Sequence, residues 1–182
     1  IFIGDGGVGK TCLLSTWDSN LFPVGDYTPT IYNTIEKEVL MDNMKVELEV
    51  VDTIGCEEYR DIRRALYPGT DLFIICYSVN SRISFERVDL YWINEIMYTS
   101  PGTSYIIVGT KIDLRDDKNV LEDILTSGSS IVSFDEGETF ARSTQARGYY
   151  ECSSKTCKGI NSLFEECIRI VLSSRNSKSS KN

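Results

Sequence analysis

The sequence predicts an α/β fold: a mostly parallel sheet of six strands, one of them antiparallel, with helices on both faces. Three observations support this prediction. Continuous apolar runs at residues 71–77 and 105–108 are typical of strands buried on both faces of a sheet. Helical patterns separate the strand-like runs, and strands that alternate with helices form parallel sheets. The glycine-rich residues 4–11 lie between an apolar run and a helical pattern, as loops at the sheet edge do in such folds.

Length and composition indicate one domain. The 182 residues, of which 41% are apolar and 25% charged, can bury a proper core. The net charge of −8 argues against a nucleic-acid surface, which needs a basic face. Histidine is absent, which excludes histidine general bases and metal ligands. The six cysteines contain no C-x-x-C pair, so reduced thiols of a cytosolic protein explain them best. No run approaches the roughly 20 apolar residues that cross a membrane.

The first half of the chain predicts three strands, a helix and a long loop. Residues 1–3 end a buried strand, and a helix begins at Cys12, after the glycine-rich segment. Two prolines and a glycine make residues 20–30 an exposed, mobile loop. Apolar and charged residues alternate in residues 45–52, which is the period of a half-buried strand. With residues 34–41 this strand predicts a hairpin around a two-residue turn.

The second half predicts four helices and the remaining strands. Apolar residues recur at helical spacing from Phe85 to Ile96, which predicts a helix over residues 81–98. The polar residues 116–132 contain a short helix at about 120–125. A capping box, Ser133-x-x-Glu136, begins the next helix, which we expect Gly148 to close. The remaining expected elements are a strand at residues 149–152 and a final helix with an apolar stripe from Ile160 to Val171.

The end of the chain has a different charge from the rest. From Ile168 onward there are four basic and no acidic residues, whereas residues 1–167 carry 15 basic and 27 acidic ones. Residues 174–182 are rich in Ser, Lys and Asn and are predicted to be a disordered basic tail. Two interpretations remain open for these charges: the solvated end of a helix, or a contact with an anionic membrane.

The segment GDGGVGKT at residues 4–11 fits the phosphate-loop pattern G-x-x-x-x-G-K-[ST] at every fixed position. Its glycines allow backbone N–H groups to point inward at phosphate oxygens, in conformations that a side chain would block. The helix N-terminus adds partial positive charge, and Lys10 reaches the outer phosphates. Thr11 offers a hydroxyl to Mg²⁺. This segment therefore predicts a nucleotide site.

A second motif, Thr110-Lys111-Ile112-Asp113, predicts guanine as the base. The Asp113 carboxylate can accept two hydrogen bonds from the N1–H and exocyclic amine of guanine, whereas adenine would leave it unpaired. Lys111 would lay its alkyl stem over the base. The segment Ser153-Ser154-Lys155 would supply backbone N–H to the guanine oxygen.

Two further groups are expected beside the phosphates. Asp52, at a strand end, would hold Mg²⁺ through water, and Gly55 of the Asp52-x-x-Gly55 motif would bring a backbone N–H to the γ-phosphate. Thr30 would complete the Mg²⁺ shell only when that phosphate is present. Two loops ordered by one phosphate would make the nucleotide a switch.

Together these segments resemble the small GTPases of the Ras superfamily, and within it the Rho/Rac family. The resemblance covers residues 1 to about 173, and the polar residues 116–132 are similar to that family's helical insert. It implies a GTP-binding G domain of the phosphate-loop NTPase fold over residues 1–173. The segments that carry the Rho/Rac resemblance are Gly4-Asp5-Gly6, Val8-Gly9-Lys10-Thr11-Cys12-Leu13-Leu14, Tyr27-x-Pro29-Thr30 and Thr110-Lys111-x-Asp113-Leu114-Arg115-Asp116-Asp117.

The resemblance also implies roles for single residues. Phe22 would pack against the guanine, Tyr27 would cover the phosphates, and residues 30–37 would form the effector face. Exchange factors, activating proteins and effectors would bind a monomer through residues 22–37 and 54–66. The expected catalytic residues are Lys10, Thr30, Gly55 and Cys56. The expected metal ligands are Thr11, Thr30 and Asp52. The expected nucleotide contacts are Asp5, Gly6, Gly7, Val8, Gly9, Lys10, Thr11, Cys12, Phe22, Tyr27, Thr30, Gly55, Lys111, Asp113, Ser153, Ser154 and Lys155.

The chain departs from the family pattern in four places. Cys56 stands where the family has its catalytic glutamine, and Ile54 where it usually has alanine. Val51 stands where an aromatic residue is usual, which bears on the choice of exchange factor. No C-terminal prenylation box is present in the 182 residues, either because it was trimmed or because the protein lacks it.

Two functions therefore remain open. The first is a signalling GTPase, expected to act on the cytoskeleton, that cycles between GDP and GTP and hydrolyses GTP slowly. The second is a GTP-locked module that recruits effectors with negligible hydrolysis, which Cys56 and Ile54 favour. A phosphate-loop kinase is disfavoured by Asp113 and by the lack of a second substrate lid. We expect a cytoplasmic protein, held peripherally at the inner face of the plasma membrane if the full-length protein is prenylated.

Overall fold

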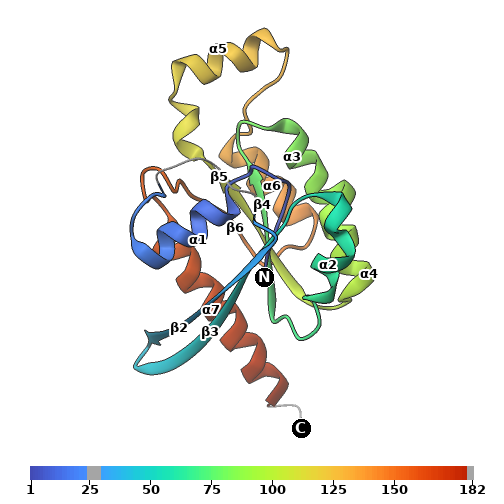
Figure 1. Ribbon diagram of the computed structural model, residues 1–182, viewed down its shortest axis with the longest axis vertical. Helices are drawn as coiled ribbons and strands as arrows, with labels where there is room; N and C mark the ends of the chain where they lie inside the picture. Colours follow the sequence, from blue (N-terminus) through green and yellow to red (C-terminus); the bar gives the residue numbers. More distant parts are fainter. Residues whose placement is uncertain (24–29, 180–182) are drawn as a thin grey trace.

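The computed structural model, which describes residues 1–23 and 30–179, contains a six-stranded sheet with helices around it (Figure 1). The strand order is β2-β3-β1-β4-β5-β6. Among the strands of the described residues, the β2–β3 pair alone is antiparallel, and the other neighbouring pairs are parallel. The predicted fold class is therefore confirmed. The strands are β1 (Phe2–Ile3), β2 (Tyr32–Met41), β3 (Met44–Thr53), β4 (Leu72–Ser78), β5 (Ser104–Thr110) and β6 (Tyr149–Glu151).

Helical segments connect these strands. Three irregular ones accompany the α-helices: η1 (Glu57–Tyr59) and η3 (Ile112–Arg115) are 3₁₀ turns, and η2 (Val88–Ile93) is π-helical. The run α3–η2–α4 is continuous from Arg82 to Thr99, which agrees with the helix predicted over residues 81–98. The α-helices are α1 (Lys10–Ser19), α2 (Arg60–Ala65), α3 (Arg82–Arg87), α4 (Asn94–Thr99), α5 (Lys118–Thr126), α6 (Phe134–Ser143) and α7 (Ile160–Ser179).

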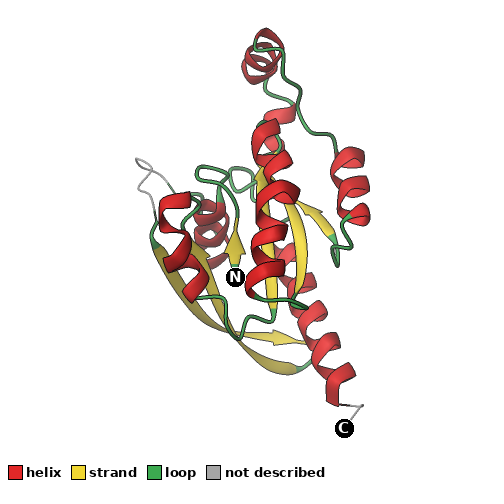
Figure 2. Ribbon diagram, turned by 90° about the vertical axis from the view of Figure 1, so that its right-hand side faces the viewer, coloured by secondary structure: helices red, strands yellow, loops and turns green. Residues whose placement is uncertain are grey.

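The core has two layers, one on each face of the sheet. Successive strand residues point to opposite faces, so Phe2 joins one cluster and Ile3 the other. On the first face α1 and α7 cover the sheet, and the rings of Trp17 and Phe164 stack with centroids 3.9 Å apart. On the second face the α3–η2–α4 run and α6 bury residues such as Trp92, which is fully enclosed. Figure 1 shows α1 and α7 on one side of the sheet and α3 and α4 on the other, and Figure 2 looks onto the side of α3 and α4.

The end of α6 differs from the prediction. The helix ends at Ser143, where the N–H of the next residue, Thr144, bonds back to Phe140, and Gln145 then takes a positive φ of 64°. Gly148 therefore does not close the helix. The chain leaves early because the N–H of Arg147 donates to the Tyr105 carbonyl (2.8 Å), which draws it toward β5.

The end of α7 also differs. The helix continues to Ser179, so residues 174–179 are helical and the prediction of a disordered tail from residue 174 is wrong for them. In this last part Arg175 pairs with Asp71 at 2.7 Å, outside the helix, and the Ser174 hydroxyl donates to the Ile170 carbonyl of the preceding turn. Residues 180–182 lie outside the described residues.

The insert at residues 116–132 contains the predicted short helix as α5. The Asp117 carboxylate caps its first turn by accepting from the N–H groups of Asn119 and Val120. No residue of α5 is buried, and the helix stands apart from the sheet at the top of Figures 1 and 2. Within the described part of the chain, every helix is too short or too polar to cross a membrane.

Candidate nucleotide site

The glycine-rich loop joins β1 to α1 at the carboxyl edge of the sheet. Its first glycine, Gly4, has a φ of 139°, and a Cβ there would lie 2.2 Å from the carbonyl oxygen of Cys76 in β4. Only glycine therefore allows the loop to leave the sheet here. Lys10 folds back into the loop, and its ammonium donates to the carbonyls of Gly4 (2.6 Å) and Asp5 (2.9 Å). Burial lowers the pKa of Lys10, and an anion beside the ammonium would favour its charged form.

The three expected metal ligands lie together. The Thr11 hydroxyl donates to Oδ2 of Asp52 at 2.6 Å and lies 3.1 Å from the Thr30 hydroxyl. These residues come from α1, the end of β3 and the segment before β2, so the fold brings three distant parts of the chain to one point. The structure thus brings Thr30, the last residue of the loop that the sequence predicts to be mobile, next to the phosphate loop.

Asp52 provides a test of whether these residues fit a cation. It is 2% exposed, and its Oδ1 is buried without a hydrogen-bond partner among the described residues. Burial raises the pKa of this carboxyl, whereas the hydroxyl of Thr11 and the charge of Lys10 favour its ionised form. A hard cation would provide the missing partner, because oxygen atoms are its preferred ligands. The donor set therefore fits Mg²⁺, which would neutralise phosphate charge when bound.

Gly55 and Cys56 lie directly on the phosphate loop. A Cβ on Gly55 would lie 2.3 Å from the backbone nitrogen of Gly6, so only glycine fits at this contact. The exposed Cys56 places its Sγ 4.0 Å from the position that a Cβ of Gly6 would occupy. The Ile54 side chain is 6% exposed and packs inside. The departures at residues 54 and 56 thus leave Gly55 in contact with the loop.

Residues of α3 and η2 hold the carboxylates beside this contact. Arg87 donates from Nε to Oδ1 of Asp5 (3.0 Å) and from Nη2 to Glu57 (2.6 Å). The indole N–H of Trp92 also donates to Oδ1 of Asp5 (2.8 Å). An acidic side chain within a phosphate loop would repel a nucleotide. The positive charge of Arg87 offsets the negative charge of Asp5, and the neutral indole N–H adds a hydrogen bond to the same carboxylate. Sequence reasoning missed both donors because Trp92 belongs to an apolar stripe and Arg87 is 82 residues from Asp5.

The predicted base-binding residues Thr110 and Lys111 form hydrogen bonds with the phosphate loop. The hydroxyl oxygen of Thr110 lies within hydrogen-bond distance of the carbonyls of Val8 (2.5 Å) and Tyr77 (2.9 Å), and its one hydrogen can be donated to either. The Lys111 ammonium donates to the Gly7 carbonyl at 2.7 Å, and its Cε lies 3.7 Å from the position of a Cβ on Gly9. Burial lowers the pKa of Lys111. The alkyl stem of Lys111 is therefore held over the phosphate loop, where it can form one wall of a base site.

Asp113 and the Ser153-Ser154-Lys155 segment meet as the sequence predicts, but one detail differs. The Ser153 hydroxyl donates to Oδ1 of Asp113 at 2.5 Å and accepts from the N–H of Thr156 at 3.1 Å. The N–H of Ser153 itself donates to the Lys158 carbonyl at 3.0 Å. It is therefore not free for the guanine oxygen. If this segment contacts the guanine oxygen, the N–H groups of Ser154 and Lys155 are the ones that would do so.

The remaining predicted residues lie at the rim or outside the described chain. Cys12 is half-buried in the first turn of α1, and Phe22 is 41% exposed just before the gap at residues 24–29. Tyr27 lies outside the described residues. Within the described chain, no cluster of three or more Cys, Asp and Glu residues is arranged to hold a metal by itself. The Mg²⁺ site is therefore one that protein and phosphate oxygens would share, which is common for this ion.

A parallel sheet with a phosphate loop, a guanine-reading carboxylate and a shared metal site defines a guanine-nucleotide-binding protein of the phosphate-loop class. Residues 1–173 match the model of the Ras family, and the chain belongs to this family of small GTPases. This membership supports guanine-nucleotide binding, usually with Mg²⁺, and a GTPase switch as the general function.

Proposed function

We propose that this chain is a Rho/Rac-like switch that hydrolyses GTP slowly. The observation that carries the proposal is the place of Cys56, whose thiol lies over Gly6 where the resemblance predicts a glutamine amide. An amide can accept a hydrogen bond from an attacking water and donate one to a phosphoryl oxygen. A thiol does both weakly, and its side chain is shorter. Losing one such contact costs roughly 10²–10³ in rate.

Several parts of the site support residual hydrolysis. Lys10 lies inside the phosphate loop, and Thr11, Thr30 and Asp52 meet where Mg²⁺ would bind. These groups stabilise the charge of the phosphoryl group independently of Cys56. Such stabilisation favours slow turnover of GTP over a GTP-locked module. We keep the locked module as the second candidate, because both Ile54 and Cys56 depart from the family pattern.

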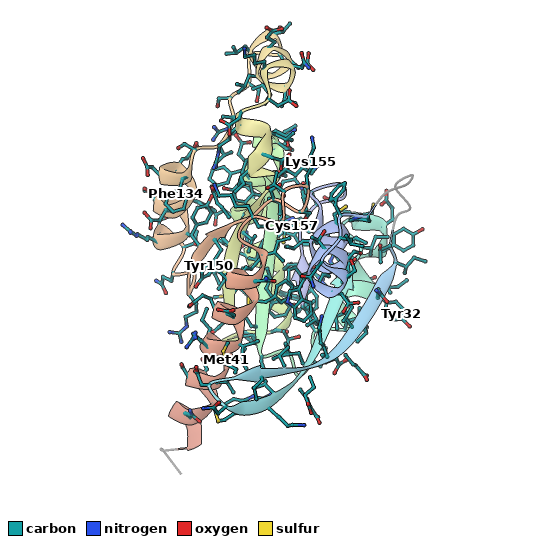
Figure 3. All side chains as sticks on the ribbon, turned by 90° about the vertical axis from the view of Figure 1, so that its left-hand side faces the viewer. Tyr32, Met41, Phe134, Tyr150, Lys155 and Cys157 are labelled. Atoms are coloured by element: carbon teal, nitrogen blue, oxygen red, sulfur yellow. The ribbon has the colours of Figure 1, made fainter. Side chains whose placement is uncertain are left out.

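The proposed partners are exchange factors, activating proteins and effectors. The described parts of residues 22–37 and 54–66 expose large apolar side chains: Ile31 is 55% exposed and Tyr32 58% on the first segment, and Tyr59 41% and Ile62 50% on the second. Figure 3 shows the side chain of Tyr32 pointing away from the body. Exposed apolar side chains gathered beside the nucleotide site suit a protein interface.

The Rho/Rac assignment rests on the motifs and on the helical insert. We propose a cytoskeletal signalling role for a cytoplasmic monomer, with peripheral membrane attachment if the full-length protein carries a lipid. The separate helix α5 supports the assignment, because it lies in the segment similar to the insert of that family.

Identifying the nucleotide that copurifies with the protein tests the proposal. Chromatography of the released nucleotide should show mainly GDP if the chain turns over GTP. Single-turnover hydrolysis of loaded GTP should then give a slow but measurable rate with Mg²⁺ and none in excess chelator. Copurified GTP with no measurable hydrolysis would support the locked module. Adenine nucleotide, or none, would overturn both candidates.

A further inference from the structure

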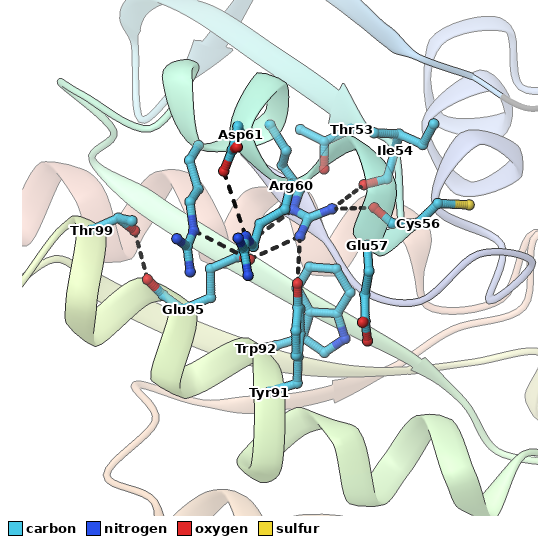
Figure 4. Close-up of polar contacts among 12 residues, drawn as sticks. Thr53, Ile54, Cys56, Glu57, Arg60, Asp61, Tyr91, Trp92, Glu95 and Thr99 are labelled. Carbon is cyan, nitrogen blue, oxygen red and sulfur yellow. Dashed lines mark hydrogen bonds and ion pairs between the residues drawn. The ribbon is translucent and has the colours of Figure 1, made fainter.

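A buried arginine lies behind the contact between Gly55 and the phosphate loop. Arg63 of α2 is fully buried, and its Nη1 donates to the carbonyls of Ile54 (2.9 Å) and Cys56 (3.0 Å). These two residues flank Gly55 in the chain. Figure 4 labels Ile54, Cys56 and Glu95, and its dashed lines mark polar contacts at all three residues.

The carbonyl of Ile54 and the N–H of Gly55 belong to the same planar peptide unit. In a trans peptide these two groups point in opposite directions, and no peptide bond among the described residues is cis. Holding the Ile54 carbonyl toward Arg63 therefore turns the Gly55 N–H away from it. Within residues 1–23 and 30–179 that N–H donates to no backbone or side-chain acceptor. It remains available to a ligand beside the phosphate loop.

A second hydrogen bond fixes the other side of Ile54. Its N–H donates to the Ile31 carbonyl at 3.1 Å, next to Thr30 of the metal site. Ile54 is therefore held at its N–H by Ile31 and at its carbonyl by Arg63. The peptide that carries the Gly55 N–H has little freedom to rotate.

Glu95 of α4 holds Arg63 in turn. The carboxylate accepts from Nε and Nη2 of Arg63, each at 2.9 Å, and from the hydroxyl of Tyr67 at 2.6 Å. The Arg63 guanidinium also lies over the Trp92 ring, 4.6 Å from its centroid. A buried arginine paired and hydrogen-bonded in this way has one geometry, because its planar fork matches the carboxylate.

We propose that Arg63 is a positioning residue that aims the Gly55 N–H at the terminal phosphate of bound GTP, and that Glu95 fixes Arg63 for this purpose. The inference rests on the proposed function. GDP lacks the terminal phosphate, so the role of Arg63 concerns GTP and not GDP. This selectivity separates a positioning role from a general contribution to folding.

Arg63→Lys tests the proposal, because lysine keeps a charge for Glu95 but cannot reach both carbonyls as a fork does. Dissociation constants for GDP and for a non-hydrolysable GTP analogue are measured by displacement of a fluorescent nucleotide. We expect the affinity for the analogue to fall about tenfold and that for GDP to stay within about twofold. Single-turnover hydrolysis should slow as well. The matched control is Arg60→Lys, on the same helix but exposed and paired only with Asp61 among the ion pairs of the described residues.

Glu95→Gln keeps the test decisive if Arg63→Lys does not fold. The amide retains the shape of the carboxylate but loses one acceptor. The affinity for the GTP analogue should therefore fall by less than in Arg63→Lys, and the affinity for GDP should again change little. The inference would be overturned by a folded variant whose affinities for the two nucleotides fall equally, or by one in which neither affinity falls. If the unaltered chain binds no guanine nucleotide, the proposed function itself fails.

Discussion

The hydroxyl of Ser153 donates to the carboxylate of Asp113 across 40 residues of chain, at a distance of 2.5 Å. Ser153 is fully buried, and the N–H of Thr156 donates to the same hydroxyl oxygen. The oxygen therefore has a fixed position, and one oxygen of Asp113 is oriented before any base binds. This arrangement leads to the first two predictions.

Ser153→Ala should lower the affinity for guanine nucleotides while preserving the preference for guanine over other bases. Without the hydroxyl, Asp113 keeps its acceptors but can rotate, so part of the binding free energy is lost in ordering it. We expect the affinities for GDP and GTP to fall equally, by about tenfold. Equilibrium binding with fluorescent nucleotides measures both affinities. Ser162→Ala, on the surface of α7, is the control and should bind as the unaltered chain does. An unchanged affinity in Ser153→Ala would show that Asp113 needs no such support.

Asp113→Asn should change which base is bound. The substitution replaces one acceptor oxygen with a donor amide that faces the guanine amine, and it removes the charge from a charge-assisted pair. We expect the affinity for GTP to fall by roughly 100-fold or more and xanthine nucleotide to bind better than it does to the unaltered chain. Competition binding with the two nucleotides measures both effects. A variant that retains the original affinity for GTP would contradict the assignment of Asp113 as the base reader.

Hydrogen exchange should differ between nucleotide states in two segments, Phe22–Lys37 and Ile54–Leu66. The hydrogen bond from the N–H of Ile54 to the Ile31 carbonyl joins these segments, and the contact between the hydroxyls of Thr11 and Thr30 joins the first of them to the phosphate loop. We expect stronger protection with the GTP analogue than with GDP in both segments. The β4–β5 pair serves as an internal control with equal protection. Equal protection of the two segments in both states would refute the switch.

Hydrolysis should accelerate when the amide is restored. Cys56→Gln should raise the single-turnover rate by roughly 10²-fold, because the longer side chain can both accept from water and donate to a phosphoryl oxygen. Ile54 is buried and its backbone is hydrogen-bonded on both sides, so Ile54→Ala added to Cys56→Gln should change the rate little further. If only the double variant is fast, Ile54 was the obstacle. If neither is faster, the explanation by the missing glutamine is wrong.

The sequence by itself determined the fold class, the phosphate loop and the hairpin. Each depends on residues that are close in the chain: the glycines of residues 4–11 and the alternation in residues 45–52 act through local backbone geometry and burial. The carboxyl edge of a parallel sheet then places Asp52 and Asp113 on the same side as the loop. The nucleotide site could therefore be predicted in outline before its geometry was known.

Only the tertiary structure decided how those groups are held. Arg63 and Glu95 lie 32 residues apart, and Arg87 and Asp5 lie 82 apart, so no local pattern marks either pair. The sequence also could not show that α6 ends at Ser143 or that α7 continues to Ser179. The N–H of Arg147 bonds to β5 just after the end of α6, and Arg175 in the last part of α7 pairs with Asp71. The physical reason is the same in each case: a polar side chain finds its partner only after the sheet and helices have brought distant segments together.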